Sequence, residues 1–177
     1  ISLGQLMVDE KTNEIKVIPD ILKKLCLEGA IVTLDAMGCQ KTIAEQVIEQ
    51  KGDYILRVKA NQGGLHDAMK TTFERAENAG FQAMTYYQAK DETNNDHGRV
   101  ESRRCMVLPL MYLFGMSLKW KKLRSLILVI SDRETHEEKT TEYRYYISSL
   151  DPKQPELILR SIREHWQVEN NLHWVLD

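Results

Sequence analysis

Two acidic residues occupy positions that a purely structural role explains poorly, and Asp35 is the first. It directly follows a short apolar run, 30–34, whose β-branched residues are typical of a strand buried on both faces. Ligand sites of open α/β sheets gather at the carboxyl ends of such strands. The competing interpretation is a turn acid or a helix N-cap, which is common at this kind of position.

Glu169 is the second acid, and it lies in a helical pattern that runs from 156 to 177. At 100° per residue from Leu157, Glu169 falls at about 120°, in the middle of the apolar arc between Ile158 and Ile162. A carboxylate there must be neutral, paired or bound to a cation, because an isolated buried charge is strongly unfavourable.

Several partners could satisfy Glu169. One is an arginine or lysine from another element, and a second is hydrogen bonding to His165 and His173, one turn away on either side. Those histidines could instead join Glu169 around zinc, although no further ligand cluster supports such a site. A fourth is a cage for Mg²⁺ or Mn²⁺ shared with Asp35, because these hard ions prefer oxygen ligands. Such a cage needs a third acid, and the polar-turn residues Asp9 and Glu14 are weak candidates.

The elements that position these acids follow an α/β pattern. Strand 30–34, a helix around 43–48 and strand 53–59 form a βαβ unit, whose two strands are therefore predicted to be parallel. We also expect a strand at 2–8, a short helix that begins at Pro19 and ends before Gly29, and a helix over 63–80.

The pattern changes at residue 81 and becomes β-rich, with strands expected at 83–89, 99–108, 125–130 and 141–149. The polar stretch 91–98 and the segment 133–139 are predicted turns, the second of them a hairpin tip. We therefore divide the chain into a first core part (1–80), a β-rich insertion (81–150) and a final helix that completes the core (151–177).

Composition narrows the class of protein. The 177 residues carry 24 Lys and Arg against 26 Asp and Glu, and 42% are apolar, which is ordinary for a globular protein. Three widely spaced cysteines without a C-x-x-C pair argue against a disulfide framework or a structural zinc site and favour a reducing, cytosolic setting. No membrane span or secretion leader is visible, and the chain reads as a piece of something longer. Dinucleotide, Walker and nucleophile-elbow motifs, which would indicate a small-molecule enzyme, are absent from the sequence.

Basic residues gather between 99 and 124, where seven positive charges face one acid, Glu101. A solvated surface and a patch that faces a polyanion are the two interpretations. Arg99, Glu101 and Arg103 alternate along a predicted strand and so share one face. They could form a cross-strand ion-pair ladder, or they could position the DNA backbone. Trp120 among the lysines is either a nucleic-acid contact or half-buried. The basic residues are Arg99, Arg103, Arg104, Lys119, Lys121, Lys122 and Arg124.

Three further polar residues, Lys59, Asn61 and Gln62, end the second strand of the βαβ unit. They lie at the same sheet edge as Asp35, because parallel strands end together. They could contact phosphate or base beside a scissile bond, or they could only close a turn.

The sequence resembles a known family, the DDE-class insertion-sequence transposases of the H-repeat-associated type. The resemblance spans nearly the whole chain, and DAMGCQ and the W-x-V-E-N-x-L-H-W block are its most specific parts. The matching strings are "DEKTNEIKVIP" (9–19), "GAIVTLDAMGCQKTIAEQVIEQKGDYILRVKANQ" (29–62), "HGRVESRRC" (97–105) and "REHWQVENNLHWVLD" (163–177).

The resemblance implies a ribonuclease-H-like mixed sheet with flanking helices and a β-rich insertion before the last, catalytic helix. It implies Asp35 and Glu169 as the second and third acids of the catalytic triad, binding Mg²⁺ or Mn²⁺. The first acid would lie upstream of residue 1, so we expect the chain alone to be inactive. Where related transposases carry Tyr, Arg and Lys around the glutamate, this chain has Ile162, His165 and Leu176; His165 is a candidate contact to DNA phosphate.

The implied partners are transposon-end and target DNA in the bacterial cytoplasm, at the nucleoid, with no membrane and with a homodimer as one open arrangement. The implied reaction is metal-dependent cleavage followed by strand transfer. Two rival functions are a nuclease or resolvase on the same fold, and a non-catalytic remnant that binds DNA or another subunit.

Overall fold

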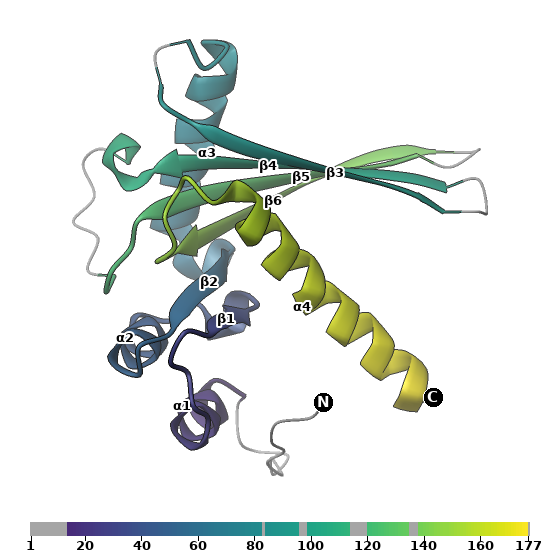
Figure 1. Cartoon of the computed structure of the whole chain (residues 1–177). Coiled ribbons are helices and arrows are strands. Elements are labelled where there is room, and N and C mark those ends of the chain that lie inside the picture. The colour runs from purple at the N-terminus through teal and green to yellow at the C-terminus, as the bar shows by residue number, and fades with distance from the viewer. Residues whose placement is uncertain (1–13, 83, 96–98, 114–119, 135–137, 177) are drawn as a thin grey trace.

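A computed structural model describes residues 14–82, 84–95, 99–113, 120–134 and 138–176, with the backbone alone described at 14–16, 92–95, 99–100 and 167–176 (Figure 1). Six strands form one sheet in the order β1-β2-β6-β5-β4-β3. β1 and β2 are parallel, and every other neighbouring pair is antiparallel. The strands are β1 (Ile31–Leu34), β2 (Asp53–Val58), β3 (Tyr87–Asn95), β4 (Arg99–Pro109), β5 (Ser125–Glu134) and β6 (Lys139–Ser148).

Helices cover both faces of this sheet. α1 (Glu14–Lys24), α2 (Lys41–Glu49) and α3 (Gly63–Asn78) pack on one face, and α4 (Pro155–Leu176) crosses the other (Figure 1). β5 shows why the sheet is buried: Leu126, Leu128 and Ile130 belong to the core under α1–α3. Ile127 and Val129 belong to the core under α4. The alternation follows from the two-residue period of a strand.

The predicted mixed sheet with flanking helices is confirmed, and so is the parallel βαβ unit made by β1, α2 and β2. β1 is less buried than predicted, because it is the outermost strand of the described sheet and all four of its residues are only partly covered. β3 to β6 are longer than predicted and continue the same sheet, since β6 pairs with β2. The division into core and insertion therefore stays a prediction.

Two expectations concern the N-terminal region. The predicted strand at 2–8 lies outside the described residues. The helix predicted to begin at Pro19 begins at Glu14, so Pro19 lies inside α1. Ile18 and Leu22, four residues apart, both belong to the packing of the core and carry the helical pattern across the proline. None of the helices in the described part of the chain is long and apolar enough to cross a membrane.

Two buried serines join β6 to β2. Ser149 Oγ accepts the Tyr54 N–H at 2.9 Å and donates to Asp53 Oδ1 at 2.7 Å. Ser148 Oγ donates to the Tyr54 carbonyl at 2.7 Å. These bonds fix the place where the antiparallel strands meet the parallel pair.

Replacing Ser149 with Ala should therefore lower the free energy of unfolding by about 1–3 kcal/mol, because the buried Tyr54 N–H loses its acceptor. Urea titration of the variant measures this loss. Ser161→Ala is the matched control: its hydroxyl donates only to the Leu157 carbonyl within α4, so its effect should stay within about 0.5 kcal/mol. Equal effects of the two substitutions would contradict the role given to Ser149.

Candidate functional site

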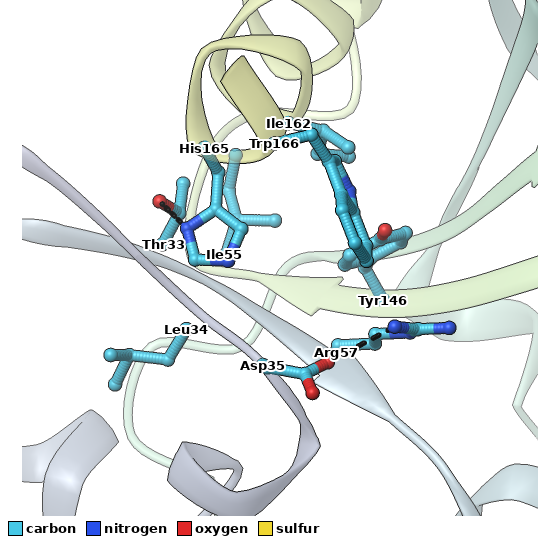
Figure 2. Close-up of a pocket in the computed structure, with 9 residues that line it drawn as sticks. All are labelled: Thr33, Leu34, Asp35, Ile55, Arg57, Tyr146, Ile162, His165 and Trp166. Carbon is cyan, nitrogen blue, oxygen red and sulfur yellow. Dashed lines mark hydrogen bonds and ion pairs between the residues drawn. The ribbon is translucent and has the colours of Figure 1, made fainter. Parts of the chain in front are cut away.

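Helix α4 contacts the edge of the sheet next to Asp35. The Thr33 hydroxyl on β1 and His165 Nδ1 on α4 are 3.1 Å apart (Figure 2). Thr33 and Asp35 project to the same side, because side chains alternate along a strand. Asp35, His165, Ile162 and Trp166 accordingly line one small pocket between β1, β2 and α4.

Two cations hold the Asp35 carboxylate, whose side chain is 49% exposed. Arg57 Nη1 donates to Oδ1 at 3.2 Å, and Lys59 Nζ lies 3.7 Å from Oδ2. Partial burial raises the pKa of Asp35, but the Ala36 N–H and the charges of Arg57 and Lys59 outweigh it, so the pKa lies below its ordinary value. At neutral pH Asp35 is an ionised, solvent-accessible carboxylate.

The turn that follows Asp35 leaves no room for a side chain at position 38. A Cβ on Gly38 would lie 2.8 Å from Leu34 Cβ, closer than real Cβ contacts come. The turn is a single 3₁₀ turn over Ala36–Gly38, and its Gly38 N–H donates to the Asp35 carbonyl at 2.9 Å. The direction in which Asp35 leaves β1 thus depends on this glycine.

Asn61 and Gln62 bind the same turn through their side chains. Asn61 Nδ2 donates to the Ala36 carbonyl at 2.6 Å, and Gln62 Nε2 donates to the Cys39 carbonyl at 2.9 Å. The structure brings these residues and Lys59 beside Asp35, as expected from the parallel strands. Their observed contacts are turn-closing ones for the two amides and an ion pair for Lys59.

Glu169 lies on α4, four residues or about one turn beyond His165. Its side chain, like those of Glu14 and His173, lies outside the described residues, as does Asp9 altogether. Its partnership with Asp35 and the alternatives of a salt bridge, histidine bonding or zinc therefore stay predictions. Within the side chains that the structure describes, no group of three Asp, Glu, His or Cys is placed to hold a metal.

The basic residues of 99–124 do not form one patch among the residues described. Arg103 pairs with Glu101 at 2.6 Å, while its neighbour Arg104 pairs with Asp132 at 3.6 Å. Glu101 also pairs at 3.0 Å with Arg133, directly opposite it in the β4–β5 register, which agrees with the ion-pair ladder interpretation.

The other basic positions lie elsewhere. Lys121 pairs with Glu45 of α2, and Lys122 pairs with Asp53 at the start of β2. Trp120 is buried, which agrees with a packing role. Arg99 lies in β4 with its side chain outside the described part, and Lys119 is outside it altogether.

Sequence reasoning missed Arg57, which is 13% exposed and contacts Asp35 directly. A signal for it exists: Arg57 is the one charged residue inside the apolar part of β2, residues 54–58. Trp166, on the apolar side of α4, contacts the Arg57 guanidinium, whose Cζ lies 5.3 Å from the ring centroid. A charge on the buried face of a strand requires such partners.

Comparison with known proteins agrees with this architecture. The family model described as "Transposase DDE domain" matches residues 1–177. The chain is 41% identical over 180 residues to the "H repeat-associated putative transposase YhhI" of Escherichia coli K12, covering 99% of the chain and 46% of that protein. It is 39% identical over 183 residues to the "Putative transposase YncI" of Escherichia coli O157:H7, covering 100% of the chain and 45% of that protein.

The chain therefore belongs to the DDE transposase family, which confirms the resemblance seen in its sequence. It spans about half the length of the curated relatives it matches. A third relative, "Putative protein YbfL" of Escherichia coli K12, is 41% identical over 180 residues, covering 99% of the chain and 46% of that protein.

The ionised state of Asp35 can be tested by pH titration. Its folded-state pKa is lowered, so its contribution to stability is present above the unfolded value, about 3.9, and is lost as the pH falls through the folded pKa. The difference in unfolding free energy between the wild type and Asp35→Asn should shrink accordingly in acid. Carbon-detected NMR should show the Asp35 carboxyl titrating below its ordinary range, and Lys59→Met should raise that pKa. An Asp35 pKa above the ordinary value would contradict the assignment.

Proposed function

We propose that the protein binds DNA, cuts transposon ends and joins them to target DNA by metal-assisted phosphoryl transfer, with Asp35 and Glu169 as two of its metal-binding acids. The observation that carries this proposal is the position of Asp35. It is an ionised, half-exposed carboxylate at the carboxyl end of β1, in a pocket lined by α4, the helix that contains Glu169.

The direction of α4 supports the pairing of the two acids. Ile55 of β2 and Ile162 of α4 line the same pocket, and two residues further along β2 Arg57 contacts Trp166, four residues further along α4. The strand and the helix therefore advance in the same direction. Thr33 of β1 contacts His165 of α4, and β1 is parallel to β2. Two residues beyond Thr33 the strand reaches Asp35, and one turn beyond His165 the helix reaches Glu169.

The carboxylate of Asp35 is the kind of ligand that a hard divalent cation prefers. Asp35 offers carboxylate oxygens, which Mg²⁺ and Mn²⁺ prefer, and Glu169 would add a second carboxylate. When bound, such ions activate the nucleophile and neutralise charge on the transferring phosphoryl group. Asp35 and Glu169 would hold the ions, and the charges of Arg57 and Lys59 keep Asp35 ionised.

DNA would approach this edge of the sheet beside Lys59, whose side chain is 48% exposed. Asn61, Gln62 and His165 lie around the same edge and are proposed to support that contact. Further contacts to the DNA backbone remain proposed for Arg99, Arg103, Arg104, Lys119, Lys121 and Lys122. The substrate places the reaction in the bacterial cytoplasm at the nucleoid, and a homodimer is an arrangement compatible with joining two ends.

The test of this proposal is the loss of cleavage without loss of binding. In the whole protein with Mg²⁺, Asp35→Asn and Glu169→Gln should each reduce end cleavage by roughly a thousandfold or more, because a metal ligand contributes several kcal/mol at the transition state. Gel shifts with the same labelled ends should remain within about twofold of the wild type.

Asp20→Asn is the matched control, since Asp20 pairs only with the exposed Lys23 on α1 in the described contacts. It should leave cleavage unchanged. Full activity of Asp35→Asn would refute the assignment. Cleavage without joined product in the wild type would instead identify a nuclease or resolvase on this fold.

Lys59 provides a second test through the salt dependence of DNA binding. If its amine contacts a phosphate, Lys59→Met should weaken binding and reduce the slope of log affinity against log salt concentration by about one. Fluorescence anisotropy at several salt concentrations measures both quantities. Lys23→Met, which removes a more exposed cation on α1, should change neither. Wild-type binding that is insensitive to salt would contradict a phosphate contact.

A further inference from the structure

Arg57 lies at the centre of a group of side chains that connects three elements. We call Asp35, Arg57, Glu142, Arg144 and Trp166 the Arg57 cluster. Arg57 contacts three of its members. Asp35 Oδ1 lies at 3.2 Å, and the Trp166 ring has its centroid 5.3 Å from Cζ (Figure 2). Glu142 Oε1 lies at 3.6 Å. A nearly buried guanidinium with three partners has little freedom to rotate.

Arg144 braces the cluster from β6. Its guanidinium Cζ lies 4.4 Å from the centroid of the Trp166 ring, and it forms a bidentate pair with Glu142. The hydrogen bond from Arg144 lowers the pKa of Glu142, and the charge of Arg57 lowers it further, so Glu142 is an anion between two arginines. The Trp166 ring therefore contacts two guanidinium groups, those of Arg57 and Arg144, through cation–π attraction.

From this geometry we infer that Arg57 is a positioning residue for both metal-binding acids. It orients Asp35 through one guanidinium nitrogen, and through its contact with Trp166 it sets where α4 lies three residues before Glu169. This inference rests on the proposed function, because Glu169 is given its metal role there. It goes further by naming the residue that fixes the separation of the two acids.

Lys59 separates this role from a simple effect of charge. It pairs with the other oxygen of Asp35 at 3.7 Å, but its side chain is 48% exposed, compared with 13% for Arg57. Removing either cation takes a positive charge away from the metal position, which by Coulomb's law favours metal binding. Removing Arg57 also releases Asp35 and Trp166. The two substitutions should therefore have opposite effects on metal affinity.

Mn²⁺ titration followed by electron paramagnetic resonance tests this in the whole protein. Lys59→Met should bind Mn²⁺ as tightly as the wild type or a few-fold more tightly. Arg57→Met should bind it about tenfold more weakly, as found when groups that orient metal ligands are removed. Trp166→Leu should resemble Arg57→Met, and the double variant should be no weaker than either single one, because both act through the same contact.

Hydrogen exchange measures the position of α4 without any metal. Arg57→Met and Trp166→Leu should speed amide exchange over residues 163–169 several-fold, whereas Lys59→Met should not. Val47→Ala is the control for general destabilisation. Val47 is a fully buried residue of α2, on the opposite face of the sheet, so this variant should lower the Tm and leave Mn²⁺ affinity unchanged.

Tighter Mn²⁺ binding by Arg57→Met, or unchanged exchange over 163–169 in that variant, would overturn the inference. If the wild type binds no Mn²⁺, or if Asp35→Asn and Glu169→Gln leave its affinity unchanged, the proposed function fails instead. The exchange data for Arg57→Met and Trp166→Leu then still decide whether Arg57 positions α4.

Discussion

A positive charge on the covered side of β2 constrains much of the surrounding structure. Arg57 follows Ile55 on the side of the sheet that faces α4, where water screens it little. Its charge needs anions and polarisable partners, and three elements provide them: β1 with Asp35, β6 with Glu142 and α4 with Trp166. The same contacts that neutralise this cation bring the end of β1 and the middle of α4 together.

The sheet explains how segments so distant in the chain meet at that point. β6 returns antiparallel beside β2, and the serines at its end bind Tyr54 and Asp53. The chain then turns and enters α4 at Pro155, so the helix passes back over β2 and β1. Strands β3 to β6 thus lie between Asp35 and α4 in sequence, while their last member places α4 over Asp35 in space.

Much of this arrangement could be predicted from the sequence, because local periodicity reports local structure. The apolar run before Asp35 and the helical pattern of 43–48 predicted the parallel unit. The apolar arc of the last helical pattern predicted α4. The continuation of α1 through Pro19 could not be foreseen, because contacts with the core decided it.

Ion pairing is where sequence reasoning was weakest. The partners of Arg104, Lys121 and Lys122 are Asp132, Glu45 and Asp53, which lie 28 to 76 positions away and approach only in the folded protein. Counting charges within 99–124 could not include them. Arg57 differs, since a single cation inside an apolar strand already indicates that an anion must come to it.

Gly38 has a consequence for how this family can diverge. Its lack of a side chain answers a steric demand of Leu34 and involves no chemistry. Selection for folding alone therefore suffices to retain it, whereas Asp35, three positions earlier, pairs with Arg57 and is also proposed to bind metal. A decayed genomic copy that has lost its activity but still encodes a folded domain would accordingly keep the glycine, while the replacements it accepts at Asp35 would be those that still satisfy Arg57.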